Sequence, residues 1–442
     1  MNEQRTQAYL NLINQLLSCN DGDEPRILQE NRELLDEGLV QVMVAVAQQY
    51  ENAGRENEAR WLMNMAQQLA QALGLLGEET TATANTPRDY LNFLMKTLLK
   101  ISENRNPQVI YPFWEQNLDK LDDNLAQILD SWTREKLRQI IREQAYSIAV
   151  DIVNFSILIK EFPLGNIAAN HEIAITGYEI ALTIVTFDVF PQDWARVQIN
   201  LAAAYSDRIR GDKAENLERA IAACHEALKV LTLNVFPQDW ALIQNNLAFA
   251  YRYRIRGDKA ENLERAIATY QESLKVYTFN VFPQEWARTH NNLANAYCAR
   301  IRGEKAENLE RAIAARHEAL KVRTFDAFPQ QWATTQDNLA FAYSNRIKGE
   351  KAENLEKAIT AYNEALKVRT FDAFPQYWAD TQNNLAIAYC SRIRGDKAEN
   401  LEKAIASYQN ALTIRTKEAD PLNCLQTARN LASNSHFENK RR

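Results

Sequence analysis

Five consecutive copies of one 46-residue pattern occupy the C-terminal part of the chain, and this repeat limits the possible folds more than any other feature. Each copy has the form [VA]-F-P-Q-x-W-A, then R-I-[RK]-G-[DE]-K-A-E-N-L-E. The copies begin at Val189, Val235, Val281, Ala327 and Ala373. A unit this short cannot bury a core alone, so neighbouring copies must stack and share one continuous core.

The hydrophobic spacing in each copy predicts two helices. The first begins at Pro191, because the first helical turn needs no backbone N–H there, and it ends near Gly211. Asp212 with Glu215 resembles a capping box that opens the second helix. The predicted buried stripes are Trp194, Leu201, Tyr205 and Ile209 on the first helix, and Leu217, Ala220, Ile221, Cys224, Ala227 and Leu228 on the second.

The run N-L-A-x-A-Y, followed by A-I-x-x-Y-x-x-A-L, resembles the helix pair of the tetratricopeptide repeat (TPR). The common TPR has 34 residues, so this form is longer. N-N-L-A is similar to the long repeats of kinesin light chains. RIRGDKAENLE with FPQDWA is similar to cyanobacterial TPR proteins, many of which carry a C-terminal CHAT domain, a caspase-like protease fold. The resemblance implies an all-α fold, a right-handed TPR superhelical solenoid preceded by a small helical bundle. It does not include the protease, so no catalytic His or Cys is carried over.

Six segments are expected along the chain. They are an N-terminal helical bundle (1–76), a linker (77–87), a helical connecting segment (88–142), a degenerate capping repeat (143–188), the five repeats (189–418), and a partial C-terminal cap helix with its tail (419–442). The linker is predicted from the low-complexity run GEETTATANTP.

Composition narrows the classes of function. The net charge of −6 argues against a dominant nucleic-acid-binding role. Five scattered cysteines without a CxxC pair suit a reducing compartment. The first residues show no signal peptide, and the longest apolar run, at 39–47, is too short to span a bilayer. We therefore expect a cytoplasmic protein with no membrane partner.

No arrangement of residues predicts catalysis. The chain has no P-loop, GxGxxG, HExxH or GxSxG motif. His225 and His317 share a repeat position with Gln271, Asn363 and Gln409, which indicates a solvated polar position, not a ligand or base. We expect no catalytic residue, no metal and no cofactor, and hence a non-enzymatic protein.

One asparagine recurs six positions after the tryptophan of every copy. The row is Asn200, Asn246, Asn292, Asn338 and Asn384. It falls on a first-helix face other than that of Leu201 and Tyr205, and in a TPR this face lines the concave groove. An Asn amide can pair with the N–H and C=O of an extended peptide whatever its sequence, and the row resembles the asparagine ladder of the O-GlcNAc transferase groove. Alternatively, each Asn bonds the backbone of a neighbouring repeat and serves only stacking. The sequence leaves both interpretations open.

Positions on the same face that differ between copies are candidates for ligand selectivity. The apolar candidates are Leu242, Phe249, Tyr253, Phe341 and Ile387; the basic ones are Arg196, Arg252 and Arg288; the acidic ones are Asp207, Asp337 and Asp380. Exposed aromatic side chains in a groove are suitable anchors for a partner.

A basic ridge gives the main alternative partner. It consists of Arg208, Arg254, Arg300, Arg346 and Arg392, with Arg210, Arg256, Arg302, Lys348 and Arg394 two residues further on. Such a row could grip RNA phosphates, but acids of the Glu215 and Glu218 type predict salt bridges within each repeat instead. The preferred function is a scaffold that binds a peptide or partner protein. A regulatory subunit for a separately encoded CHAT-type protease is the second hypothesis, and the terminal repeats leave self-association open.

Overall fold

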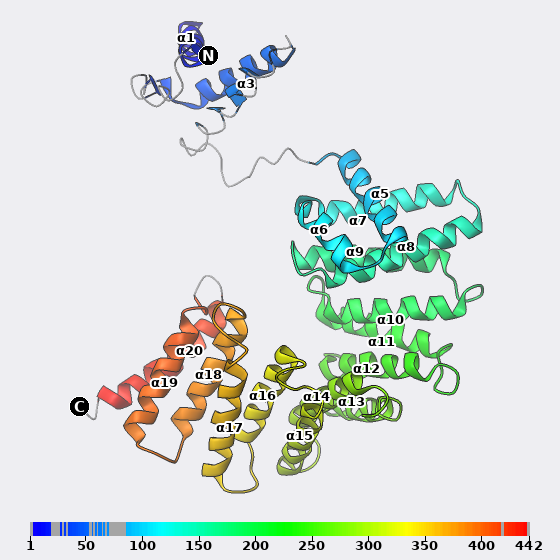
Figure 1. The fold of residues 1–442 in the computed structure, drawn as a ribbon, viewed down its shortest axis with the longest axis vertical. Helices are drawn as coiled ribbons and strands as arrows, with labels where there is room; N and C mark the ends of the chain where they lie inside the picture. Colours follow the sequence, from blue (N-terminus) through cyan, green and yellow to red (C-terminus); the bar gives the residue numbers. More distant parts are fainter. Residues whose placement is uncertain are drawn as a thin grey trace. The chain divides into compact units, whose positions relative to one another are not determined.

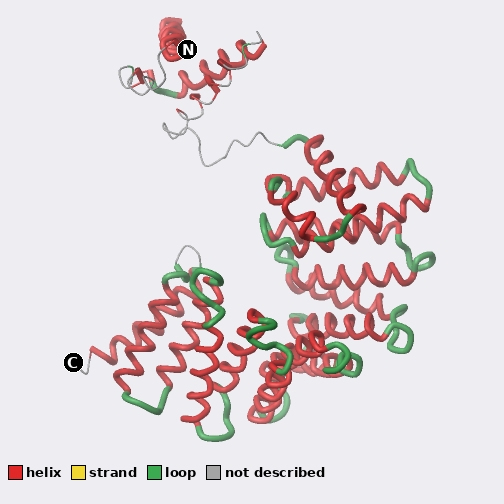
Figure 2. Tube along the Cα trace, in the orientation of Figure 1, coloured by secondary structure: helices red, strands yellow, loops and turns green. Residues whose placement is uncertain are grey.

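The structure is a computed structural model that describes residues 85–416 and 420–439 without a break. Before residue 85 it describes 3–18, 27–28, 31, 34–52, 55, 58–59, 61–63, 65–66 and 69, so most of the predicted linker 77–87 lies outside the described residues. The chain divides into two compact units, Met1–Ala84 and Asn85–Arg442. Helices are the only regular elements in the described ranges, as Figure 2 shows, which confirms the all-α prediction.

The first unit packs α1 (Glu3–Ser18) with α3 (Glu37–Asn52). Tyr9 and Ile13 of α1 and Leu39 and Met43 of α3 share its buried core. The Tyr9 hydroxyl donates to Asp36 just before α3 at 2.7 Å. The apolar spacing that predicts a helical bundle therefore matches the buried faces of these two helices.

The second unit opens with three helices that precede the repeats. They are α5 (Pro87–Glu103), α6 (Pro107–Glu115) and α7 (Asp123–Leu137), with a short 3-10 turn, η2 (Leu118–Lys120), before α7. Thr86 and Asp89 form a reciprocal capping box at the start of α5. A helix pair, α8 (Arg142–Glu161) and α9 (Ile167–Ile184), follows and continues into the repeats.

Five further helix pairs then stack in sequence order, each pair packed on the next (Figure 1). The pairs are α10 (Pro191–Asp207) with α11 (Lys213–Leu228), α12 (Pro237–Tyr253) with α13 (Lys259–Ser273), α14 (Pro283–Ala299) with α15 (Lys305–Leu320), α16 (Pro329–Ser344) with α17 (Lys351–Leu366), and α18 (Pro375–Ser391) with α19 (Lys397–Leu412). A last helix, α20 (Pro421–Asn439), packs on α19. Every first helix begins at the proline the sequence predicts.

The turn within each pair is built around a glycine in the left-handed region. Gly211 has a φ of 77°, which a residue with a Cβ rarely adopts. The first helix ends at Asp207, so the prediction that it runs to near Gly211 is wrong: the glycine shapes the turn, not the helix end. Asp212 caps the second helix by accepting from the Glu215 N–H at 2.7 Å.

The predicted buried stripes are largely confirmed. Leu201 and Tyr205 are buried on α10, and Leu217 through Ala227 form the buried face of α11. Trp194 is only half-buried and meets the edge of Phe187 at 5.2 Å between ring centroids. Ile209 is 62% exposed, so its placement in the stripe is wrong, because it lies past the end of the helix.

Candidate functional site

The first helices of three consecutive copies surround a cavity of about 140 Å³. Asn246 and Phe249 from α12, and Arg288 and Asn292 from α14, line it together. Ala203, Ser206 and Asp207 of α10 and Asn245 of α12 complete the lining. The structure thus brings five of the candidate residues, Asp207, Asn246, Phe249, Arg288 and Asn292, into one hollow between copies.

The asparagine row is half-buried along its whole length. Within the part of the chain that the structure describes, the side chains of Asn200, Asn246, Asn292 and Asn338 make no hydrogen bond, and Asn384 only accepts one at 3.5 Å from Asn383. The described residues therefore contain no hydrogen bond that supports the other interpretation, in which each Asn of the row bonds the backbone of a neighbouring repeat. Four amides remain available to a ligand.

A second asparagine in each copy carries the structural role instead. Asn216 donates to the Arg210 carbonyl at 2.8 Å and accepts from Arg208 at 3.3 Å, which fixes the turn between the paired helices. The same donor bond recurs for Asn262, Asn308, Asn354 and Asn400. The chain therefore contains one asparagine row with satisfied side chains and one without.

The apolar candidates differ in how accessible they are. Tyr253 is 45% exposed, with its ring 4.8 Å from that of Phe249 and the Arg252 guanidinium 4.5 Å from its centroid. Phe341 and Ile387 are also exposed. Leu242 is half-buried and packs against the main hydrophobic core, so most of its surface is not free for a ligand.

The acidic candidates are all paired with basic side chains of the array, although Asp207 also lines the cavity. Asp207 accepts from Lys160 at 2.8 Å, and Asp380 accepts from Arg415 at 2.6 Å. The side chain of Asp337 is only 15% exposed, lies 3.4 Å from Arg369, and accepts from Thr381 at 2.9 Å. Burial raises the pKa of the Asp337 carboxyl despite the opposing effect of Arg369. Asp207 and Asp337 thereby link consecutive copies, whereas Asp380 pairs within its own copy. Helical spacing alone could not predict these contacts, because it does not distinguish the groove from the surface that packs on other parts of the array.

Among the basic candidates, Arg196 likewise reaches the next copy, 3.4 Å from Asp239. Arg252 donates to the hydroxyl of its neighbour Tyr253 at 2.9 Å. Arg288 makes no ion pair within the described residues and lines the cavity. It is therefore the basic candidate best placed to meet a ligand.

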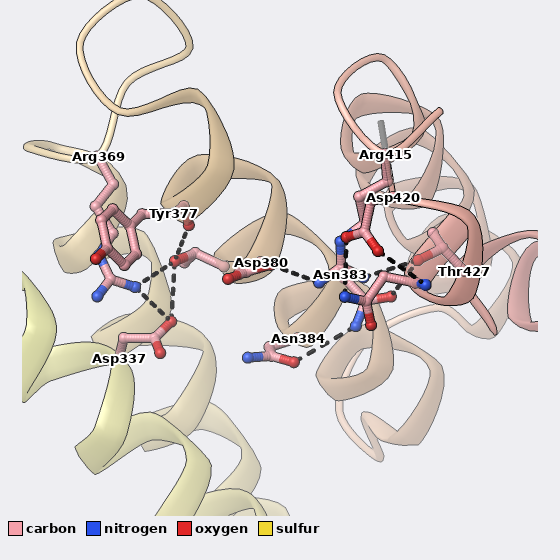
Figure 3. A network of polar contacts seen from close by, with 11 residues as sticks. Asp337, Arg369, Tyr377, Asp380, Asn383, Asn384, Arg415, Asp420 and Thr427 are labelled. Atoms are coloured by element: carbon pink, nitrogen blue, oxygen red, sulfur yellow. Dashed lines mark hydrogen bonds and ion pairs between the residues drawn. The ribbon is translucent and has the colours of Figure 1, made fainter. Parts of the chain in front are cut away.

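A polar network that sequence reasoning missed runs between the C-terminal copies. Figure 3 shows Arg369 beside Asp337 and Tyr377, and Arg415 beside Asp380, Asn383 and Thr427. Arg369 and Arg415 are buried at a repeat position that holds Leu231 in the first copy. The substitution of arginine for leucine at one repeat position was visible in the sequence and is the signal that could have found this network.

The first row of the basic ridge, Arg208 to Arg392, is neutralised, but by a different partner from the predicted one. Arg254 binds both carboxylate oxygens of Glu218, at 2.7 and 2.8 Å, and Glu218 belongs to the preceding copy. The pairs Arg208–Glu172, Arg300–Glu264, Arg346–Glu310 and Arg392–Glu356 repeat this geometry. The prediction of salt bridges within each repeat is therefore wrong, because each turn lies over the second helix of the previous pair. Guanidinium groups held this way are not free to grip phosphates.

The histidine position is not simply solvated either. His225 lies 3.3 Å from the Tyr251 hydroxyl, and His317 lies 3.0 Å from that of Tyr343, each in the next copy. Burial lowers the pKa of both imidazoles. Gln271 donates to Tyr297 in the same way, so the position links copies through a tyrosine.

Searches of the described residues for two other kinds of site gave negative results. No helix there combines the length and apolar character needed to cross a bilayer. No cluster of three or more His, Cys, Asp or Glu side chains there is arranged to hold a metal ion.

Comparison with known proteins identifies the repeat. The tetratricopeptide repeat family matches residues 240–276, 286–326, 332–372 and 378–412, and each match begins at the tryptophan of one copy and contains its second helix. Residues 240–412 are tetratricopeptide repeats. Among solved structures, the crystal structure of the P58(IPK) TPR domain matches at 14% identity over 99% of each chain, with a TM-score of 0.29. No curated protein sequence matches. The assignment rests on the family match and the repeated helix pairs. TPR arrays are scaffolds for protein–protein contacts and present extended binding surfaces.

Proposed function

We propose that this TPR array binds an extended segment of a partner protein along its first helices and performs no catalysis. The observation that carries the proposal is the asparagine row, whose side chains are half-buried, spaced one per copy and without partners at four positions. A half-buried amide without a protein partner keeps its donor and its acceptor free, and the backbone of a ligand can pair with both. The cavity between α10, α12 and α14 also supports this choice of binding surface, since two members of the row line it.

The residues that vary around the row supply selectivity in this proposal. Half-buried Phe249 lines the cavity and forms an aromatic pair with exposed Tyr253. Phe341 and Ile387 present apolar surface further along the array. Backbone pairing therefore provides affinity for many sequences, and these side chains select among them.

The test is an affinity capture from cell lysate with mass spectrometry. The triple variant Asn246→Ala, Asn292→Ala and Asn338→Ala is compared with the wild type. We expect the captured partner to bind at least about tenfold more weakly, since each lost hydrogen bond contributes about 0.5–1.5 kcal/mol. Circular dichroism should show unchanged helicity, because these side chains make no hydrogen bond within the described residues.

A matched control removes exposed amides from the second helices. Asn363→Ala with Asn410→Ala changes the same residue type outside the groove and should leave partner binding as in the wild type. Equal binding by the wild type and a folded triple variant would contradict the proposal.

A further inference from the structure

The positive charge of Arg316, on α15, has no acidic partner within the described residues. The side chain is 1% exposed and forms no ion pair there. Its Nη2 donates to the Asn295 side chain at 3.0 Å and its Nη1 to the Cys298 sulfur at 3.3 Å, and Nε is buried without a hydrogen-bond partner. A charge removed from water is normally paired, because its desolvation is costly. In the third copy, the group that faces this charge is a thiol.

Cys298, near the end of α14, is a free thiol and only half-buried. It packs against the apolar cluster of Ile313, Leu339 and Ala342, which joins the third and fourth copies. The rest of its surface is open to solvent, so a small solute can reach this cysteine. The buried guanidinium therefore lies behind a thiol that solvent can reach.

The fifth copy holds an uncharged pair at the same two repeat positions. The Cys390 sulfur lies 4.0 Å from the Tyr408 hydroxyl. Tyrosine also occupies the arginine position in the second and fourth copies, at Tyr270 and Tyr362. In the first copy this position holds Cys224, and burial raises the pKa of its thiol to about 12. The chain thus offers one thiol beside a guanidinium, a matched thiol beside a phenol, and a third that burial keeps protonated.

The pairing of Cys298 with Arg316 favours chemistry at the sulfur. A cation beside a thiol favours the thiolate, which is the form that attacks peroxides. The oxidised product, a sulfenic acid or its anion, then offers the guanidinium an oxygen acceptor. We infer that Cys298 is a modification site that hydrogen peroxide oxidises, with Arg316 as the positioning residue that stabilises the anionic sulfur. The inference does not depend on the groove binding a partner.

Hydrogen peroxide alone balances this oxidation step. The Cys298 thiolate attacks one peroxide oxygen, so an S–O bond forms while the O–O bond breaks. The departing hydroxide takes up the proton that the thiol released and leaves as water. The sulfur loses two electrons and the peroxide gains them, which converts the thiol to a sulfenic acid.

The first experiment compares the cysteines of one molecule. The full chain, reduced beforehand, is treated with hydrogen peroxide in the presence of dimedone, which traps sulfenic acids, and mass spectrometry of its peptides reads each cysteine separately. We expect Cys298 to be labelled at least about tenfold faster than Cys390, because susceptibility follows thiolate character and exposure. Buried Cys224 is the protected reference. Labelling of Cys298 at the rate of Cys390 or slower would overturn the inference.

The second experiment removes the charge. Arg316→Tyr copies the residue of three other copies, so the helix pair should fold, and circular dichroism checks that it does. Labelling of Cys298 should slow at least about tenfold, whereas that of Cys390 should not change. Arg316→Lys keeps the charge and should stay within about threefold of the wild type. A role in packing alone would slow both variants equally, and that result, or no slowing in Arg316→Tyr, contradicts the assignment of Arg316.

The third experiment moves the arrangement to the fifth copy. Tyr408→Arg with Ile387→Asn places the equivalents of Arg316 and Asn295 beside Cys390. Labelling of Cys390 should rise at least about tenfold, and Ile387→Asn alone, the matched control, should leave it at the wild-type rate. A folded double variant in which Cys390 reacts no faster than in the wild type would also overturn the inference.

Discussion

Four equivalent sites at the contact between two consecutive copies are apolar in the first copies and polar three copies later. Around α10 and α12 they hold Val197, Ile199, Leu231 and Ile243, all buried in the main core. Around α16 and α18 they hold Thr335, Asp337, Arg369 and Thr381. Arg369 donates to Thr381 and pairs with Asp337, and Thr381 donates to Asp337, whereas Thr335 accepts from Arg323. The helix pairs are otherwise alike. The same kind of helix pair therefore stacks through apolar contacts in the first copies and through polar contacts in the later ones.

The hydrophobic core differs between the first copies and the later copies in the same way. One apolar cluster runs from Tyr90 to Ala266, whereas the later copies share several small clusters. Apolar contacts tolerate small shifts, because the hydrophobic effect is non-directional. A buried ion pair compensates for its desolvation only with good geometry. The comparison teaches that the C-terminal copies depend on a few specific bonds, and three changes test that dependence.

The largest effect is expected from Arg369→Leu, which leaves Asp337 buried without its charge partner. We predict a loss of about 3–5 kcal/mol in local stability, the usual cost of breaking a buried pair. Hydrogen exchange of the α16–α18 amides is the measurement, because a repeat array need not unfold in one step.

The control installs the apolar residues of the first copies at the three positions that bond to one another. Asp337→Ile, Arg369→Leu and Thr381→Ile are combined, and Thr335 is kept because its hydroxyl accepts the hydrogen bond from Arg323. This variant should match the wild type or exceed it by about 1–4 kcal/mol. A single Arg369→Leu variant as stable as the wild type would refute the proposed dependence on this pair.

A smaller effect is expected from pH. The pKa of Asp337 is raised above its ordinary value of 3.8 by burial, with Arg369 opposing. The folded state therefore holds this proton more tightly than the unfolded state. Stability contributed by the protonated form should fall as pH rises from 3.8 to the raised pKa, by at most about 1.4 kcal/mol per pH unit. Amides of α16–α18 report the change, α10–α12 serve as the internal reference, and Asp337→Asn should abolish the difference.

The sequence predicts the helix pairs well because proline, glycine and apolar spacing act locally. Pro191 starts its helix as expected, and the buried faces of α10 and α11 follow helical spacing. The prediction that Ile209 is buried was wrong, because the burial of this side chain depends on where the helix ends. The prediction of a salt bridge between Arg254 and an acid of its own repeat was wrong, because acids of two copies lie within reach. Only the stacking geometry selects Glu218.

The site was predictable to a smaller extent. Asn246, Phe249, Arg288 and Asn292 do share a cavity. Asp337 was misplaced, since it lies next to the asparagine row in sequence but packs against the following copy. The environment of Arg316 could not be predicted, because whether an arginine has an acidic partner depends on contacts between helices.

The smallest effect is expected from weakening one ion pair between copies, and the loss of stability should be the same in the first copies and in the later ones. Arg254 and Arg346 bind Glu218 and Glu310 through paired N–H donors, with closely similar distances and partial exposure. Lysine keeps the charge but cannot form the two parallel bonds. Arg254→Lys and Arg346→Lys should therefore each cost about 0.5–1 kcal/mol, and less at high salt. Exchange rates of the flanking amides measure both, with Arg265→Lys, in an exposed pair within one helix, as the control. A clearly larger loss at Arg346 would mean that the polar interior weakens the outer ion pair too, so the two regions would differ in more than their buried contacts.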